Sequence, residues 1–332
     1  MMAMAEADVE GFEAATAPFR TELFAHCYRM TGSIQEAEDI VQDTYVRAWR
    51  AFDRFEGRSS VRTWLYRIAT NTSLTALANG TRRPLPSGLG PPSGDPLAQY
   101  QPEPPGVRWL EPAPDRLVIG DTGDPADIVT ARHSVRLALV AALQVLPPRQ
   151  RAALVLCDVL ALTLAETAEV LGVSVAAAKS LLQRARARLA ADPVRLDDLA
   201  EPSDPGAREV LDRYMAAFEH SDMAALERLL AAEAALEMTG TTTWFAGKAT
   251  CVPYLRAFAI GSPGDWRVLP LAVNGQLGAA AYHRGDDRDY HPFAVVVLAT
   301  TATHLTRISL FGDPALFPRF ELPAVLSGRA AG

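Results

Sequence analysis

The sequence predicts a multidomain protein, with two all-α modules and one α+β module. Three observations lead to this fold class. Residues 10–83 and 128–191 have apolar side chains at the three- and four-residue spacing of amphipathic helices. A stretch rich in Pro and Gly separates these two modules. Residues 207–325 combine short helical patterns with stretches rich in Val, Thr and aromatic residues, which are typical of strands.

The first module, residues 10–83, is expected to be helical throughout. Apolar residues over 34–52 keep helical spacing, and Ser33 precedes Glu36 by three residues, which is the pattern of a capping box. A second helix is expected over 61–78. Residues 19–83 of this module carry a net charge of +3.

Residues 84–127 are expected to form an extended acidic linker. They contain eleven of the 24 prolines and carry a net charge of −5. Prolines without periodic apolar residues argue against a folded core. Trp109 and Leu110 interrupt this pattern, and the ring of a Trp usually needs a place to be buried. We therefore interpret Trp109 and Leu110 as a regulatory part of the linker that packs on a folded module.

The second module, residues 128–191, ends in a helix-turn-helix pattern. Gly172 lies in the short turn between its last two helices, and Ser174 is placed to cap the final helix. The module carries a net charge of +5. The expected helices cover residues 135–146, 149–160, 163–171 and 174–189.

The final helix of this module has two unlike faces. Ala178, Leu182 and Ala185 share an apolar face that can pack on the rest of the module. An apolar back and a basic front suit a helix that enters the major groove of DNA. The front carries four polar or basic side chains: Lys179, Ser180, Gln183 and Arg184.

Charge and composition limit the class of protein. The whole chain carries −7, and residues 192–332 carry −6, yet the two basic modules can still meet phosphates locally. No run of apolar residues is long enough to span a bilayer, so no membrane association and a cytoplasmic location are expected. The three cysteines lie far apart, so no disulfide framework, metal site or cofactor is expected.

Several motifs resemble extracytoplasmic-function sigma factors of the sigma-70 family. They occur in the family's order and cover about the first 190 residues. The resemblance implies a region 2 domain in residues 10–83 and a region 4 domain in residues 128–191. The matching stretches are residues 27–33, 37–44, 47–49 and 55–71 for region 2, and residues 146–151 and 179–186 for region 4.

The resemblance also implies roles for particular residues. Asp39, Gln42 and Asp43, which share one helix face, correspond to the surface that docks on the clamp of the largest polymerase subunit. Region 4 would meet the flap of core RNA polymerase and, through Lys179, Ser180, Gln183 and Arg184, the −35 element of promoter DNA. Residues that correspond to the −10 element site are Phe55, Ser59, Ser60, Arg62, Trp64, Arg67 and Asn71.

Residues 207–325 resemble the SnoaL-like cone fold, in the stretches 244–248, 274–276 and 308–314. Relatives with this fold include enzymes, which need a carboxylate or His facing an apolar cavity. A fold alone does not establish catalysis, so no catalytic residue is assigned. The side chains weighed for that role are Glu237, His283, His291 and His304.

The sequence therefore predicts a sigma factor that directs core RNA polymerase to promoters, with no enzymatic activity. Its C-terminal domain is expected to modulate it by packing on the DNA-binding modules or on the Trp109 part of the linker, and an unidentified small ligand or regulator of that domain is kept as a further partner. The alternative is a helix-turn-helix regulator fused to a ligand-binding or enzymatic cone domain. Such a regulator would not need the Asp39, Gln42 and Asp43 face.

Overall fold

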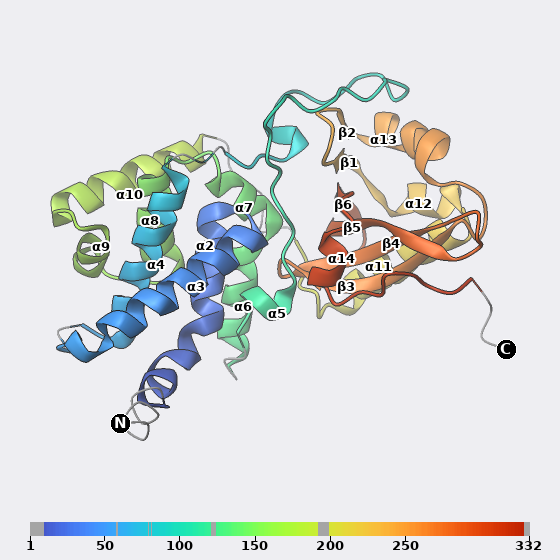
Figure 1. The fold of residues 1–332 in the computed structure, drawn as a ribbon. Coiled ribbons are helices and arrows are strands. Elements are labelled where there is room, and N and C mark those ends of the chain that lie inside the picture. The colour runs from blue at the N-terminus through green and yellow to red at the C-terminus, as the bar shows by residue number, and fades with distance from the viewer. Residues whose placement is uncertain are drawn as a thin grey trace. The chain divides into compact units, whose positions relative to one another are not determined.

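The computed structural model describes residues 10–57, 59–78, 80, 82–120, 124–191 and 199–328. The chain divides into two compact units, and each combines two separate stretches of sequence. The first unit, Met1–Arg83 with Arg116–Val194, is helical, and the second, Pro84–Asp115 with Arg195–Gly332, is built around a sheet (Figure 1).

The region 2 part of the first unit contains three long helices. Ser33 caps α3 and Ser60 caps α4, because each side chain accepts a hydrogen bond from the backbone N–H three residues later. Both helices begin where the sequence predicts. The elements are η1 (Ala17–Phe19), α2 (Arg20–Thr31), α3 (Ile34–Ala51), η2 (Phe52–Arg54) and α4 (Val61–Leu77).

The region 4 part differs from expectation at its beginning. A helix starts at Pro125, inside the expected linker, because proline fits the first position of a helix and Asp124 caps it. The helix expected over 135–146 starts only after Arg136, whose backbone is extended (ψ 134°). The elements are α5 (Asp115–Val118), α6 (Pro125–Val135), α7 (Leu137–Leu143), α8 (Pro148–Leu154), the π-helical η4 (Val155–Val159), α9 (Leu164–Leu171) and α10 (Val175–Ala190).

The helix-turn-helix of α9 and α10 confirms the sequence prediction. Thr163 and Glu166 form a capping box at the start of α9. Gly172 ends α9 with a left-handed backbone (φ 61°), a conformation that side chains with a Cβ atom seldom adopt. The apolar face of α10 is buried, with Ala178, Leu182 and Ala185 between 0% and 6% exposed.

Buried arginines join the two helical parts of this unit. Arg29, on α2, donates to Ser134 Oγ on α6 at 3.0 Å. Arg151, on α8, donates to the side-chain and backbone oxygens of Gln144 at 2.7 and 3.2 Å, and also to the backbone of Met30. Buried charges remain stable in a core only when they are hydrogen-bonded in this way.

A buried histidine makes the stability of this unit depend on pH. His26 has no exposed surface, and its Nε2 lies 3.0 Å from Thr70 Oγ1. Burial, together with the nearby Arg29 guanidinium, lowers the pKa of His26 from 6.5 to about 3. The unfolded chain therefore binds more protons than the folded chain between pH 3 and 6.5, so stability falls as the pH is lowered through that window.

We expect His26 to reduce the free energy of unfolding by about 2 kcal/mol between pH 7 and pH 5. The substitution His26→Gln removes the titrating group and should remove this part of the pH dependence. Urea unfolding of both proteins at several pH values measures the difference. Parallel pH profiles for the two proteins would contradict the assignment.

The second unit contains one six-stranded sheet in the order β2-β1-β6-β5-β4-β3. β1 and β6 pair in parallel, and all other neighbours are antiparallel. Apolar residues of α11, α12 and the strands form its main core. The strands are β1 (Leu230–Met238), β2 (Trp244–Ala246), β3 (Trp266–Val273), β4 (Gln276–Arg284), β5 (Tyr290–Thr300) and β6 (Leu305–Phe311).

One expected helix in this unit is shorter than predicted. The helical pattern over 223–232 continues only to Leu229, and the chain then enters β1 because pairing with β2 and β6 outweighs the helix preference of its alanines. The strand expectations over 279–282 and 293–300 fall within β4 and β5, and the one over 304–311 begins one residue before β6. The helices are α11 (Pro205–Glu219), α12 (Met223–Leu229), α13 (Lys248–Tyr254), the π-helical η5 (Leu255–Ala259) and α14 (Leu316–Arg319).

Candidate polymerase and nucleic-acid interfaces

The residues expected to meet core polymerase form an accessible surface on α3. Asp39 and Gln42 are exposed, and the Asp43 side chain is 46% exposed. Their polar contacts stay on the same helix, with Gln35 donating to Asp39 at 3.2 Å and Arg47 pairing with Asp43 at 2.9 Å. Exposed contacts of this kind contribute little to stability. The surface is therefore open to a partner.

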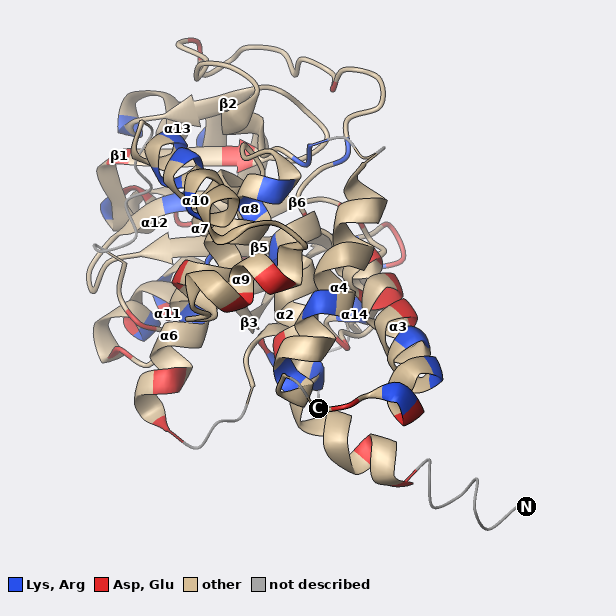
Figure 2. Cartoon of the chain, turned by 90° about the vertical axis from the view of Figure 1, so that its left-hand side faces the viewer, with Lys and Arg blue, Asp and Glu red and all other residues tan. Residues whose placement is uncertain are grey.

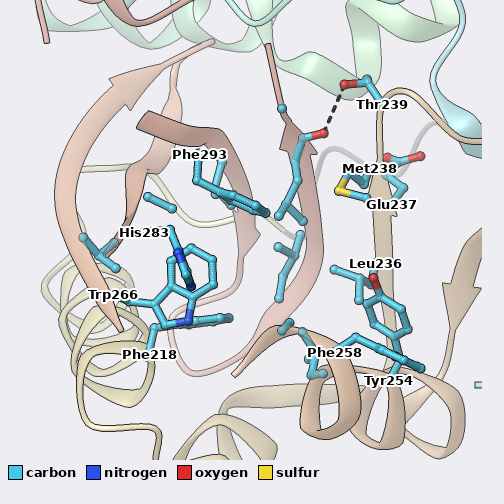
Figure 3. A pocket seen from close by; sticks show the side chains of 18 of the residues that line it. Phe218, Leu236, Glu237, Met238, Thr239, Tyr254, Phe258, Trp266, His283 and Phe293 are labelled. Carbon is cyan, nitrogen blue, oxygen red and sulfur yellow. Dashed lines mark hydrogen bonds between the residues drawn. The ribbon is translucent and has the colours of Figure 1, made fainter. Parts of the chain in front are cut away.

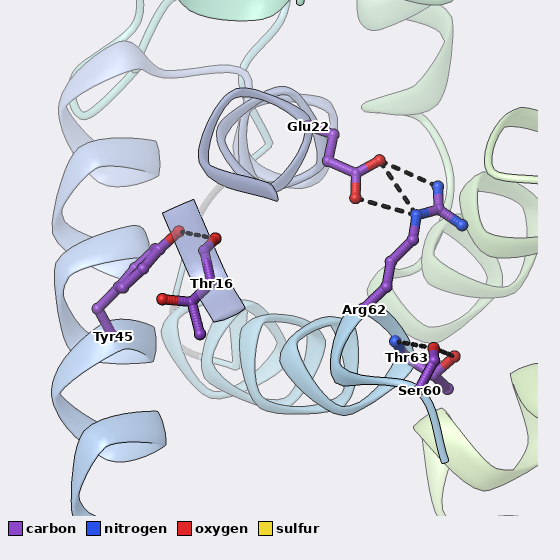
Figure 4. A network of polar contacts seen from close by, with 6 residues as sticks. All are labelled: Thr16, Glu22, Tyr45, Ser60, Arg62 and Thr63. Atoms are coloured by element: carbon purple, nitrogen blue, oxygen red, sulfur yellow. Dashed lines mark hydrogen bonds and ion pairs between the residues drawn. The ribbon is translucent and has the colours of Figure 1, made fainter. Parts of the chain in front are cut away.

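Two aromatic side chains meet where the −10 site is expected. Phe55, after η2, lies 4.9 Å from the ring centre of Trp64 on α4, and both side chains are half-buried. Ser59 is also half-buried, and Ser60 is occupied as the cap of α4, as Figure 4 shows. Arg58, in the middle of this loop, lies outside the described residues. The pair Phe55 and Trp64 offers one side of a pocket for an unstacked base.

The other residues of the expected −10 site differ in how accessible they are to DNA. Arg67 and Asn71 are exposed along α4, and Arg67 approaches Glu169 at 4.0 Å. Arg62 instead forms a two-pronged ion pair with Glu22 on α2, with N–O distances of 2.9 and 3.1 Å (Figure 4). Sequence reasoning missed this pair because its partners lie 40 residues apart. Arg62 reaches a phosphate only by leaving Glu22.

The helix α10 presents its polar residues outward. Lys179, Gln183 and Arg184 are exposed and Ser180 is half-buried, all on the side opposite the buried face. Figure 2 shows basic residues along α10 and acidic residues on α9. Among the neighbouring basic residues, Arg186 pairs with Asp158 at 2.6 Å, whereas Arg188 is exposed. The geometry is that of a recognition helix whose polar face is exposed.

The segment expected as a linker is held on the C-terminal domain. The backbone N–H of Leu110 donates to the carbonyl of Pro84 at 3.1 Å, so the two ends of this stretch meet. Leu110 is fully buried. Asn274, in the tight turn between β3 and β4, exchanges hydrogen bonds of 2.8 and 2.9 Å with the backbone of Ala113. We name Pro84–Asp115 the connecting segment.

The middle of the connecting segment is bound to the loop between β1 and β2. Gln101 donates its N–H to Thr243 Oγ1 at 2.9 Å, and its carbonyl accepts from Thr241 Oγ1 at 2.7 Å. Trp109 is only half-buried and donates its indole N–H to Glu103 in the same segment. Leu110 is therefore the buried residue of this pair, whereas the expectation of a buried ring at Trp109 is not met.

The C-terminal domain encloses a cavity of about 740 Å³ between its sheet and its helices. Figure 3 shows Phe218, Trp266, His283 and Phe293 on one side and Leu236, Tyr254 and Phe258 on the other. Cavities of this volume bind small organic molecules in other proteins.

Glu237, the carboxylate at this cavity, is already bonded. It is 1% exposed and accepts from Arg307 and Ser309 Oγ at 2.9 Å each. It also accepts the backbone N–H of Ser87, in the connecting segment, at 3.2 Å. Glu237 therefore serves as an anchor point. Of the three weighed histidines, His283 borders the cavity and is exposed, His291 lies beside Asp287 at 2.9 Å, and His304 is exposed.

No group of three or more His, Cys, Asp or Glu side chains among the described residues is placed to hold a metal ion. None of the described helices is long and apolar enough to cross a membrane.

The two helical modules match the family models Sigma-70 region 2, over residues 17–83, and Sigma-70, region 4, over residues 136–189. The ECF RNA polymerase sigma factor SigG of Mycobacterium tuberculosis is 50% identical over 314 residues, which cover 94% of this chain and 84% of SigG. SigJ of the same organism is 34% identical over 287 residues, which cover 82% of this chain and 80% of SigJ.

A solved structure extends the likeness to the whole chain. The crystal structure of SigJ from M. tuberculosis has a TM-score of 0.59 and 26% identity, and the match covers 95% of this chain and 100% of that chain. The chain belongs to the extracytoplasmic-function sigma factors. It is a transcription initiation factor whose partners are core RNA polymerase and promoter DNA. The predicted fold class is confirmed, with two helical sigma domains and an α+β, SnoaL-like C-terminal domain.

Proposed function

We propose that the helical unit has one surface that binds core polymerase and another that recognises the promoter. The α3 surface of Asp39, Gln42 and Asp43 binds the clamp of the largest polymerase subunit, while region 4 meets the flap and places α10 on the −35 element. The observation that supports this most directly is that both surfaces are exposed, whereas the opposite faces of α3 and α10 are buried.

In the −10 region, the proposed site combines an aromatic wall with exposed polar groups. Phe55 and Trp64 stack on an unpaired base, and Asn71, on the same helix as Trp64, meets the DNA strand. Arg67 contacts phosphate from its exposed position. Arg62 contacts DNA only after its ion pair with Glu22 opens, so its contribution to DNA binding is smaller.

The test of this function is run-off transcription with core polymerase and the substitution Arg184→Ala. Arg184 is exposed on the front of α10, where a contact with a base edge contributes about 1–3 kcal/mol of discrimination. The variant should lose preference at one or two −35 base pairs, by roughly 5- to 100-fold, and keep transcription from the best site measurable. Arg188→Ala, an exposed arginine one turn further along, is the matched control. An equal loss on every −35 variant would instead make Arg184 a phosphate contact.

The proposal assigns regulation to the C-terminal domain, through the connecting segment. Hydrogen bonds from Ser87, Gln101 and Ala113 hold this segment on the domain. A further bond, from Leu110 to Pro84, closes the segment on itself. Because Leu110 lies beside Pro84, the effective path between the two sigma regions is short. The stretch from Leu110 to Asp115 spans at most about 18 Å, whereas the released segment could extend to roughly 100 Å. The domain thereby limits how far region 2 and region 4 can separate.

We further propose that this domain is regulatory rather than enzymatic and that the protein acts in the cytoplasm, where core polymerase and DNA are found. The sigma factor family is not enzymatic. In the cavity, the carboxylate of Glu237 is bonded to Arg307, Ser309 and the connecting segment, which leaves it poorly placed to accept a proton from a substrate.

A further inference from the structure

We propose that the cavity of the C-terminal domain binds an uncharged, flat, largely aromatic small molecule that carries one hydrogen-bond acceptor. This inference deepens the proposed regulatory role by naming a ligand class and the residues that select it. It rests on the two aromatic walls, on the absence of net charge, on one unpartnered hydroxyl, and on a wall residue from the connecting segment.

The walls of the cavity suit a flat ligand. Trp266 meets Phe293 and His283 edge-on, with ring centres 5.0 and 4.8 Å apart, so these rings form a continuous surface. Across the cavity, Tyr254 stacks on Phe245 at 4.5 Å. Aromatic faces on both sides favour a ring system between them. The volume of about 740 Å³ leaves room for several fused rings.

The charge of the lining excludes ions. Glu237 is the acidic lining residue, and Arg307 already neutralises it at 2.9 Å. An anionic ligand would lose its hydration and meet that carboxylate, whereas a cation would find its charge already balanced. Burying an unpaired charge costs several kcal/mol or more, so a neutral ligand is favoured.

Tyr214 supplies a polar group that the protein leaves unused. It lines the cavity from α11 and is 3% exposed, and its hydroxyl makes no hydrogen bond with any described residue. Burial raises the pKa of the Tyr214 hydroxyl, which therefore stays protonated and can donate. A donor that lines the cavity and has no protein partner can bond a ligand that brings an acceptor oxygen.

Tyr100 connects this site to the rest of the protein. It comes from the connecting segment, lines the cavity, and places its hydroxyl against that of Tyr254. Its neighbour Gln101 is bonded to Thr243, another lining residue. A ligand in the cavity therefore contacts the connecting segment directly, and release of the segment removes part of the wall.

Fluorescence titration of the full chain with two neutral probes tests this site. Prodan is a flat naphthalene with a ketone acceptor, and N-phenyl-1-naphthylamine lacks the acceptor. We expect saturable, blue-shifted emission with both probes. Ala281→Phe fills the cavity and should weaken both at least about 10-fold, a loss on the scale of filling a well-packed site. Ala324→Phe, at an exposed residue outside the cavity, is the control and should change neither.

The substitution Tyr214→Phe separates the hydroxyl from the apolar walls. It should weaken Prodan by about 2- to 12-fold, the value of one hydrogen bond, and leave N-phenyl-1-naphthylamine unchanged. Tyr100→Ala should weaken both probes. Circular dichroism of each variant verifies folding, and the conservative Tyr214→Phe retains its ring in the core.

Two outcomes would overturn the proposal: no saturable binding of either probe, or full affinity retained in both Ala281→Phe and Tyr100→Ala. These titrations need neither polymerase nor DNA. Their failure would leave the transcription assays on α10 unaffected, and failure of those assays would leave the binding result standing.

Discussion

Replacing Asp39 and Gln42 together by Ala is expected to weaken binding of core RNA polymerase at least about 10-fold. Both side chains are exposed on α3, and central residues of protein interfaces often cost 2 kcal/mol or more when truncated. The fold should be unaffected, because exposed substitutions change stability by less than about 0.5 kcal/mol. Co-purification with tagged core, followed by a fluorescence titration, measures the loss.

Asp53→Ala provides the control for this experiment. Asp53 is an exposed acid of the same module, in η2, and lies outside the α3 surface. Its removal changes the net charge by the same amount and should leave polymerase binding intact. If the double variant binds core as tightly as the wild type does, α3 does not carry the polymerase contact. Equal losses in both would point to a general effect of charge.

Leu110→Ala is expected to release the connecting segment and to widen the range of promoter spacings that the factor accepts. Leu110 is fully buried, and truncating a buried Leu costs about 2–5 kcal/mol. That loss is enough to raise the population of the released segment at least about 10-fold. Region 2 and region 4 would then be joined by a longer path, so promoters with spacers longer than the optimum should gain transcription relative to the wild type.

Run-off transcription on promoters that differ only in spacer length measures this effect, and amide hydrogen exchange over residues 84–115 shows whether the segment is released. Leu97→Ala is the matched control, because Leu97 lies in the same segment but is 60% exposed. Fast exchange with an unchanged spacer profile would show that the segment does not govern spacing.

The helices and their ends could be predicted from the sequence because their causes are local. Ser33, Ser60 and Ser174 each cap a helix within three residues of themselves, and Gly172 ends α9 by its own backbone conformation. The exposed faces of α3 and α10 follow from the same helical period that buries their opposite sides. These are also the parts of the candidate site that sequence reasoning identified.

The features that were missed depend on partners far along the chain. The four alanines of β1 favour a helix, yet β6, about 70 residues later, makes this stretch a strand. Pro125 starts α6 although its position predicts linker, because proline also fits the first position of a helix. The anchors of the connecting segment are residues such as Asn274, which lies 161 positions from Ala113. Neither end of such a contact carries a local signal.

The connecting segment is also synthesised before the residues on which it docks. It emerges from the ribosome before region 4, but the turn at Asn274 and the strand β6, which complete its docking surface, follow more than 150 residues later. Because the ribosome adds roughly 5–20 residues per second, the segment exists for on the order of ten seconds or more before its docking surface is made. Every newly made molecule therefore passes through a stage in which both sigma regions are complete and the path between them is still long.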